Sequence, residues 1–203
     1  MLTNLLEASK DWVGWLDKGD AVDVIFLDMT RAFDVMPHDK LINKLVQLNV
    51  NPLVINWIAG YLTSRSQVVR VGDVYSDEAC VTSGVPQGSI IGPTLFKIFV
   101  SDVHLNLRSG NKLLADDIKV YNTAANSSVL QADLNILARW SVSNGVAFNP
   151  TKCVVLRMHR SFKHSVKVDY TLNDTVLSNV ESARDLGVIH DAQLYAIIKT
   201  PRH

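Results

Sequence analysis

The sequence of 203 residues has little of what several protein classes depend on. Its two cysteines, Cys80 and Cys153, are too few for a disulfide framework or a cysteine-based zinc site, and we expect both to be small core residues. Twenty basic and twenty acidic residues leave no net charge, which argues against a polybasic binder. Because the N-terminal segment has no basic stretch followed by an apolar run, we expect no signal peptide and a cytoplasmic or nuclear protein.

Internal repeats, low-complexity tracts and linkers are also missing, so a chain of this length predicts one domain or little more. Residues 45–64 form the one charge-free run with the length of a membrane span. Pro52 lies within that run and is better placed to begin a helix than to interrupt one, so we expect two ordinary helices and no membrane partner. Hydrophobic residues make up 47% of the chain, enough to build a sizeable core.

The hydrophobic periodicity and the Gly and Pro positions predict a mixture of helices and strands. A capping box at Ser128 and Gln131 begins one of the helices. Strands and helices alternate without a strict parallel rhythm, so the fold class is α+β. The expected helices are 4–18, 37–48, 52–62, 93–105 and 128–145; the expected strands are 22–28, 67–71, 74–81, two within 112–121, 153–158, 166–172 and 183–189.

Carboxylates follow two very apolar strands. Asp28 closes the run VDVIFLD, and Asp116 and Asp117 follow KLLA. A carboxylate beside buried residues is costly unless it is paired, hydrogen-bonded or bound to a metal, and three converging carboxylates would suit Mg²⁺ or Mn²⁺. The alternative is structural, because Asp is common at hairpin turns, and Asp34 and Asp39 lie where negative charge favours the start of a helix.

The loop SGVPQGSIIGP, residues 83–93, is the second unusual segment. Three glycines and two prolines specify its turns and allow another chain segment or a ligand to approach its backbone closely. The Lys-Ser/Thr pair of a P-loop is absent, and no GxGxxG follows a strand. ATPase and dinucleotide-binding functions are therefore excluded, and a plain connecting loop is the alternative.

Three ordered segments together resemble the first palm motifs of reverse transcriptases: FLDMTRAFDVMPHDKL at 26–41, SGVPQGSIIGP at 83–93 and LLADDIKVY at 113–121. The AFDxxPH pattern is similar to that of non-long-terminal-repeat (LINE-type) retrotransposon enzymes. The segments at 149–158 and 182–188 resemble two later palm motifs. The resemblance implies a right-hand polymerase palm, an antiparallel sheet backed by helices. Residues 1–190 would form this palm with partial fingers and no complete thumb, and 191–203 a short unassigned tail.

The resemblance also implies RNA-directed DNA polymerase activity, in which a primer 3′-hydroxyl attacks the α-phosphate of a deoxynucleotide. The implied cofactors are two Mg²⁺ or Mn²⁺ ions. Asp28 and Asp116 would bridge them with their carboxylates facing one cleft, Asp117 would be the neighbouring acid, and the Met29 carbonyl would be a further ligand. Lys152 matches a lysine near the pyrophosphate and is a candidate general acid.

Other matching positions concern the substrate. Phe33 matches an aromatic gate against a ribose 2′-hydroxyl, and Gln87, between Pro86 and Gly88, matches a contact to the nucleotide sugar. Arg31 matches a basic position that could meet phosphate. The implied partners are an RNA template, a DNA primer and a deoxynucleoside triphosphate.

The sequence departs from the family at Leu114, where Tyr or Phe is common. From the resemblance we expect most of the fingers and the thumb to lie outside these residues. A longer parent protein would supply those lobes. One alternative is a catalytically silent remnant acting at most as an interaction protein. Another, a metal-dependent phosphodiesterase, would need His or Glu clusters, and the six histidines are scattered. A run of basic residues without an intervening acid is a candidate backbone-contacting stripe: Lys152, Arg157, Arg160, Lys163 and Lys167.

Overall fold

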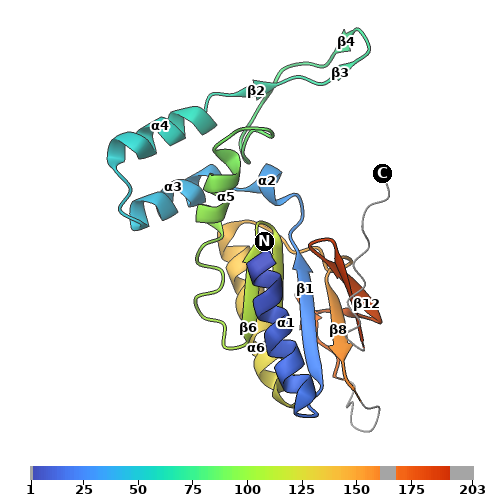
Figure 1. Ribbon diagram of the computed structural model, residues 1–203. Coiled ribbons are helices and arrows are strands. Elements are labelled where there is room, and N and C mark those ends of the chain that lie inside the picture. Colours follow the sequence, from blue (N-terminus) through green and yellow to red (C-terminus); the bar gives the residue numbers. More distant parts are fainter. Residues whose placement is uncertain (1, 161–167, 193–203) are drawn as a thin grey trace. The chain divides into compact units, whose positions relative to one another are not determined.

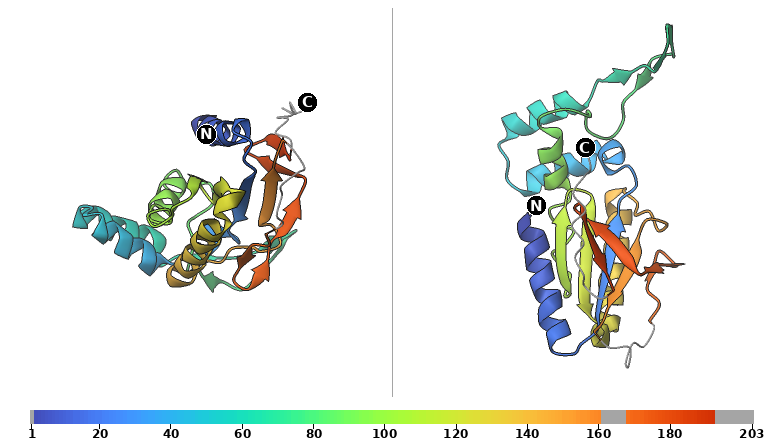
Figure 2. Two further views of the ribbon diagram at one scale, coloured as in Figure 1. Left: turned by 90° about the horizontal axis from the view of Figure 1, so that it is seen from below. Right: turned by 45° about the vertical axis from the view of Figure 1, so that its right-hand side comes forward.

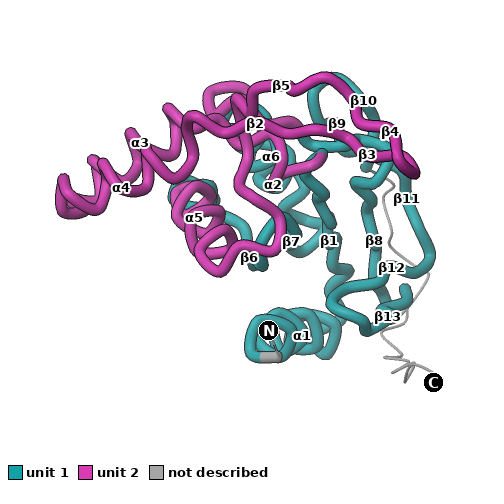
Figure 3. Tube along the Cα trace, turned by 90° about the horizontal axis from the view of Figure 1, so that it is seen from above, with its two compact units in different colours: residues 1–30, 103–140, 148–203 teal, residues 31–102, 141–147 magenta. Residues whose placement is uncertain are grey.

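The computed structural model describes residues 2–160 and 168–192. The chain divides into two compact units, shown in Figure 3. Unit 1 comprises residues 1–30, 103–140 and 148–203, and unit 2 comprises residues 31–102 and 141–147.

Unit 1 is built on a five-stranded sheet with the order β11-β8-β1-β7-β6. The central strand β1 is antiparallel to both β7 and β8, whereas β11 is parallel to β8. The strands are β1 (Val22–Asp28), β6 (Gly110–Leu114), β7 (Asp117–Thr123), β8 (Val154–Met158) and β11 (Ser178–Val180). Strand β1 is almost continuously apolar because helices cover both faces of the sheet. Figures 1 and 2 show α1 (Leu2–Asp17) on one face and α6 (Ser127–Asn144) on the other.

The core on the α1 face forms where aromatic residues of the helix meet alternate strand residues. Trp12 is fully buried, and its ring meets that of Tyr121 edge to face at 5.6 Å. Val22 and Val24 of β1 pack into the same cluster. Because strand side chains alternate, Phe26 and Asp28 extend from this same face.

The opposite face holds a buried charged network. Arg157 donates two hydrogen bonds to Asp23, at 2.6 Å and 3.0 Å, and the Tyr170 hydroxyl donates to Asp23 at 2.6 Å. Asp23 is completely buried, so this pairing is what makes its charge tolerable there. The network joins β1 and β8 to the segment that leads into β9 (Thr171–Leu172).

Three smaller elements complete unit 1. The hairpin of β12 (Ser182–Asp185) and β13 (Val188–Asp191) is antiparallel, as is the pair β9 with β10 (Thr175–Val176). A short 3₁₀ helix, η1 (Ala124–Asn126), precedes α6.

Unit 2 consists of helices and a narrow ribbon of strands. Its helices are α2 (Ala32–Val35), α3 (His38–Gln47), α4 (Pro52–Leu62) and α5 (Gly92–Phe99). Pro37 caps α3, and Pro52 begins α4, with Asn51 accepting a hydrogen bond from the Leu53 amide at 2.9 Å. The ribbon pairs β2 (Ser66–Gln67) with β5 (Ala79–Cys80), and β3 (Arg70–Val71) with β4 (Val74–Tyr75), and Figure 1 shows it projecting from α4.

Most predicted elements are confirmed, and several details were wrong. The helix predicted for 93–105 ends at Phe99. The capping box does not form: α6 begins at Ser127, and Gln131 pairs with the backbone of Thr171, so a tertiary contact replaces the local one. Cys80 is exposed, because its ribbon has no layer against it, whereas Cys153 is buried. Among the described residues no helix is long and apolar enough to cross a membrane.

The predicted basic stripe is interrupted at Arg157, whereas Lys152 and Arg160 are exposed beside acidic partners. Arg157 is buried against Asp23 on the far face, and Arg160 pairs with Asp17 at 2.6 Å. Lys163, Lys167 and most of the tail 191–203 lie outside the described residues. Of the predicted strand 166–172, residues 168–172 are described, and only Thr171 and Leu172 form a strand.

Candidate functional site

The last rung of the β1–β7 pairing places two carboxylates opposite one another. Asp28 ends β1, and its Cα partner is Asp117, the first residue of β7. Alternation along both strands puts the two side chains on the face that carries Phe26. Like charges directly opposite one another destabilise a sheet, so the pairing of Asp28 with Asp117 does not contribute to the stability of the fold.

Asp116 lies next to this rung, in the two-residue turn between β6 and β7. Leu114 pairs with Asp117, which leaves Ala115 and Asp116 as the turn. Ala115 has φ 54°, a left-handed conformation that costs an L-residue about 1–2 kcal/mol. The sequence predicted a turn on two aspartates; the structure places one aspartate in the turn and the other in the strand.

The carboxylates form a negative cluster that the protein only partly compensates. Partial burial, followed by the charges of Asp116, Asp28 and Asp185, raises the pKa of Asp117 above its ordinary value, while Lys119 acts in the opposite direction. The concentrated negative charge favours a cation at this edge of the sheet.

Lys152 is held beside the cluster by a turn tied to the end of β1. The Asn149 amide donates to the Asp28 carbonyl at 2.9 Å, and the amides of Lys152 and Cys153 both donate to the Asn149 carbonyl at 3.0 Å. Lys152 Nζ lies 3.4 Å from Asp28 Oδ2. The lysine side chain is 65% exposed, so this ion pair is accessible and weak.

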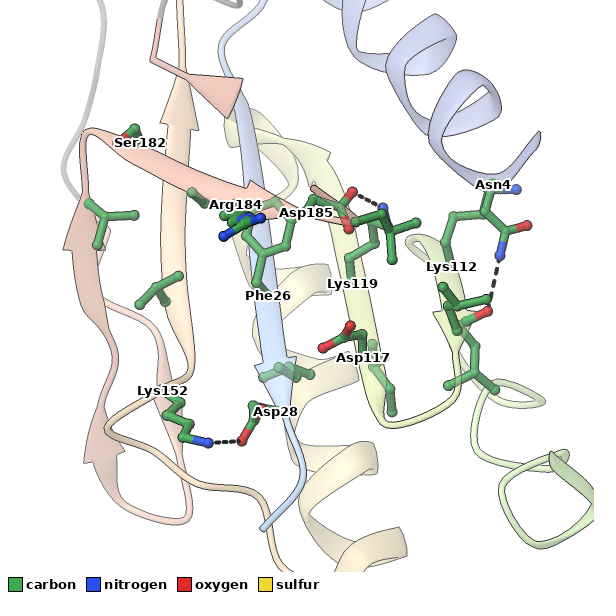
Figure 4. A pocket seen from close by; sticks show the side chains of 18 residues that line it. Asn4, Phe26, Asp28, Lys112, Asp117, Lys119, Lys152, Ser182, Arg184 and Asp185 are labelled. Carbon is green, nitrogen blue, oxygen red and sulfur yellow. Dashed lines mark hydrogen bonds and ion pairs between the residues drawn. The ribbon is translucent and has the colours of Figure 1, made fainter. Parts of the chain in front are cut away.

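A cavity of about 340 Å³ opens on the same face, as Figure 4 shows. Asp28, Asp117 and Lys152 line one end of it, and the strand carrying Arg184 crosses over Phe26 toward the other. At that end Lys119 and Asp185 form a buried ion pair. Asp28 and Asp117 therefore border a space that a ligand can enter, whereas Asp116 is not one of its lining residues.

The donor set suits a hard divalent cation. Within residues 2–160 and 168–192 no three or more His, Cys, Asp or Glu side chains are already gathered as a metal site. Mg²⁺ does not require a complete protein cage, since it commonly binds through one or two carboxylates together with water and substrate phosphates. The carboxylates of Asp28 and Asp117 on one face of the sheet, with Asp116 in the adjoining turn, fit that mode of binding.

Met29 follows β1 in unit 1, is buried and forms an antiparallel bridge with Phe148, and the remaining predicted residues lie in unit 2. Phe33 is half-buried and stacks on Phe96, with ring centroids 4.3 Å apart. Arg31 is exposed and has φ 47° just before α2. Pro86, Gln87 and Gly88 lie in the loop between the ribbon and α5, and Gly88 has φ 77°.

This loop is fastened to the segment that carries Phe33. The amides of Gly84 and Val85 donate to the carbonyls of Met36 at 2.8 Å and Phe33 at 2.9 Å. A Cβ on Gly84, whose φ is 79°, would lie 2.5 Å from the Asp34 carbonyl oxygen, so only glycine permits this approach. Gln87 Nε2 donates to Asp34 Oδ1 at 3.0 Å, and both residues line a cavity of about 620 Å³ within unit 2.

Sequence reasoning missed Asp34, Lys119 and Asp185. Asp34 was interpreted only as a helix-start residue, although its place in the same motif as Phe33 was an available signal. The pairing of Lys119 with Asp185 joins residues 66 positions apart, and no local pattern marks it.

Comparison with known proteins decides the family. The reverse transcriptase (RNA-dependent DNA polymerase) family matches residues 15–189. The chain belongs to the reverse transcriptase family. The resemblance drawn from the three sequence motifs is therefore confirmed, and enzymes of this family generally use divalent metal ions.

The similar reverse transcriptases come from non-long-terminal-repeat elements. The chain is 30% identical over 191 residues to the RNA-directed DNA polymerase from mobile element jockey of Drosophila funebris, covering 88% of this chain and 20% of that protein. It is 31% identical over 192 residues to the probable RNA-directed DNA polymerase from transposon BS of Drosophila melanogaster, covering 88% and 21%. The chain thus spans about a fifth of the length of these relatives.

Solved structures with the same fold include telomerases. Apo telomerase from Candida tropicalis, truncated from its C-terminal domain, matches with a TM-score of 0.68 at 12% identity, covering 97% of this chain and 39% of that one. Telomerase from the same organism in complex with a TWJ fragment of telomeric RNA matches with a TM-score of 0.67 at 12% identity, covering 97% and 32%. The predicted palm-like α+β fold is confirmed.

Proposed function

We propose that this chain carries the catalytic palm of an RNA-directed DNA polymerase of a non-long-terminal-repeat retrotransposon. The reaction transfers a nucleotide from a deoxynucleoside triphosphate to a primer 3′-hydroxyl opposite an RNA template. The observation that carries the proposal is the rung of Asp28 and Asp117, with Asp116 in the adjoining turn, in a chain of the reverse transcriptase family.

The carboxylates are the proposed ligands of two Mg²⁺ or Mn²⁺ ions. Asp28 and Asp116 hold them, Asp117 adds negative charge, and the Met29 carbonyl is a further ligand. When bound, such ions supply Lewis-acid activation of the attacking hydroxyl and neutralise charge on the phosphate. Burial, and after it the charges of Asp116, Asp28 and Asp185, raises the pKa of Asp117, and the second of these causes supports the assignment because a bound cation would offset it.

Lys152 is the proposed proton donor to the pyrophosphate leaving group. Its ammonium pairs with Asp28 across 3.4 Å. With a cation held by Asp28, Lys152 would be released from that carboxylate and would be free to turn toward phosphate. Its high exposure supports such movement.

The residues of unit 2 are proposed to select the nucleotide. Phe33, backed by Phe96, excludes a ribose 2′-hydroxyl by shape, and Gln87 meets the sugar. Pro86 and Gly88 set the loop that presents Gln87, and Arg31 meets phosphate.

The proposed domain boundaries are those of the sequence prediction, with residues 1–190 as a palm with partial fingers. The remaining lobes belong to a longer parent protein, in keeping with the share of the relatives that the chain spans. Template and primer would contact those lobes as well as the palm.

Primer extension on an RNA template with Mg²⁺ or Mn²⁺ tests this function. We expect Asp116→Asn to lower incorporation by at least about 100-fold, because a charge that stabilises the transition state is lost. The matched control is Asp174→Asn, an exposed turn residue at φ 61° where Asn is equally acceptable. Equal incorporation by wild type and Asp116→Asn would remove Asp116 from the mechanism, and no incorporation by either would favour the silent remnant.

A further inference from the structure

Asp34 and Gln87 face the cavity of unit 2 as a hydrogen-bonded pair. Gln87 Nε2 donates to Asp34 Oδ1 at 3.0 Å, and both side chains are exposed. The cavity holds about 620 Å³, enough for part of a nucleotide, and polar side chains from the ribbon and the loop contribute to its lining: Arg65, Ser66, Gln67, Thr82 and Ser83. Nothing in the proposed function so far requires Asp34.

An ionised carboxylate accepts hydrogen bonds and cannot donate them. The amide of Gln87 therefore has to turn its nitrogen toward Asp34, and its carbonyl oxygen Oε1 is directed away. A glutamine without this partner could present either end. The pairing with Asp34 therefore leaves Oε1 of Gln87, a hydrogen-bond acceptor, on the side of the amide that points away from Asp34.

Main-chain contacts keep the two residues together. The loop residues 83–85 and the segment 33–38 share four hydrogen bonds, so the distance between Asp34 and Gln87 does not depend on two flexible side chains meeting by chance. These bonds are Ser83 Oγ to the Asp34 carbonyl (2.9 Å), the Gly84 amide to the Met36 carbonyl (2.8 Å), the Val85 amide to the Phe33 carbonyl (2.9 Å) and His38 Nε2 to the Gly84 carbonyl (2.7 Å).

We propose that Asp34 is a positioning residue that holds Gln87 with its carbonyl oxygen toward the ligand. In this orientation the site selects nucleotides that have a free 3′-hydroxyl on the sugar. The inference rests on the proposed function, in which Gln87 meets the nucleotide sugar, and it adds the direction of the hydrogen bond. A sugar hydroxyl donates to Oε1. A sugar without that hydroxyl leaves Oε1 unpaired, which weakens binding.

The contact itself is tested without any nucleotide. In ¹⁵N-labelled protein, the side-chain amide resonance of Gln87, identified by its absence in Gln87→Ala, is compared in wild type, Asp34→Ala and Asp39→Ala. Asp39 is an exposed aspartate in the first turn of α3 and serves as the matched control. We expect the resonance to move in Asp34→Ala alone, and an unchanged resonance there would overturn the pairing.

The preference for a nucleotide with a 3′-hydroxyl is tested by calorimetric titration with dTTP and with 2′,3′-dideoxy-TTP in the presence of Mg²⁺. We expect wild type and Asp39→Ala to prefer dTTP by about tenfold, and Asp34→Ala to lose most of that preference while it unfolds at an unchanged temperature. An undiminished preference in Asp34→Ala would overturn the inference. If wild type binds neither nucleotide, the proposed function and the preference for a 3′-hydroxyl both fail for this chain. The amide resonance still shows whether Gln87 is hydrogen-bonded to Asp34.

Discussion

At the scale of single residues, the site combines charges that stability alone would not favour. Asp28 and Asp117 oppose one another on a sheet, Asp116 adjoins them, and Asp185 adds a fourth negative charge nearby. Lys119 and Lys152 compensate part of this charge. An active site that binds cations has a reason to keep such repulsion, because the bound ion relieves it.

Removal of one of these charges should stabilise the ligand-free protein. The folded-state pKa of Asp117 lies above its ordinary value, so the ionised group opposes folding at neutral pH, and this cost disappears as the pH falls below about 4. We expect Asp117→Asn to raise the melting temperature at pH 7 in EDTA by up to about 2–4 °C. Calorimetry measures the melting temperature of Asp117→Asn, with Asp174→Asn as the control. A melting temperature of Asp117→Asn below that of wild type would contradict the claim that charge repulsion at Asp117 destabilises the fold.

His190 should make the fold sensitive to mild acid. It is buried on β13 against Trp12, with ring centroids 5.3 Å apart, and neither ring nitrogen has a hydrogen-bond partner among the described residues. Burial lowers its pKa; the charge of Lys119 acts in the same direction, and those of Asp185 and Asp191 oppose it.

Because the folded-state pKa of His190 is depressed, the unfolded chain binds the proton more readily, and stability falls as the pH drops through about 6.5. We expect His190→Phe to flatten the dependence of the unfolding free energy on pH between pH 7 and pH 5. Urea denaturation across that range tests this, and an equally steep dependence in the variant would assign the acid sensitivity to other groups.

At the scale of elements, the connection between the first two motifs depends on one close approach of main chains. Gly84 and Gly88 both have positive φ, at 79° and 77°. A Cβ at Gly84 would meet the Asp34 carbonyl at 2.5 Å, whereas a Cβ at Gly88 would meet nothing within 4 Å. A substitution at Gly88 therefore tests backbone strain alone, whereas one at Gly84 tests backbone strain together with a steric clash.

We expect both Gly84→Ala and Gly88→Ala to lower the free energy of unfolding, because each places an L-residue in a left-handed conformation at a cost of about 1–2 kcal/mol. Gly84→Ala should cost about 1–3 kcal/mol more, since the loop must also move away from Asp34. Chemical denaturation of the two variants gives the difference, and equal losses would show that the loop yields freely.

The elements also show what sequence patterns can predict. The strand at 22–28 and the helix at 52–62 occur with the predicted bounds, because an apolar run closed by Asp28 and a helix begun by Pro52 are local signals. The capping box at Ser128 failed because Gln131 makes a tertiary contact to Thr171 instead. The sequence near Arg157 likewise does not show that this residue is buried in an ion pair, since its partner Asp23 is 134 residues away along the chain.

At the scale of the whole molecule, the proposed function predicts that divalent ions stabilise this chain. Binding to the folded state alone contributes about 2.7 kcal/mol when the ligand is at 100 times its dissociation constant. We expect Mn²⁺ to raise the melting temperature of wild type and of Asp174→Asn, and to have little effect on a double variant Asp28→Asn, Asp116→Asn. An equal rise in the double variant would place the ion elsewhere.

The zero net charge is a whole-molecule property whose meaning changed with the fold. Residues 1–40 hold eight acidic and four basic groups, a net charge of −4, and Asp28 is among them. Of the basic residues predicted to form a stripe, Arg157 is buried against Asp23, and Arg160 pairs with Asp17. Overall neutrality therefore coexists with a local concentration of negative charge at the end of β1.

The sequence by itself determined the family, the α+β class and the residues proposed for chemistry, because motifs and strand ends are local and keep their order along the chain. The tertiary structure decided which of those residues meet. It paired Asp28 with Asp117 across a strand register, placed Asp116 in the turn, and joined Asp34 to Gln87. The physical reason is that hydrogen-bond register and close backbone approach depend on contacts between distant segments, which no local pattern encodes.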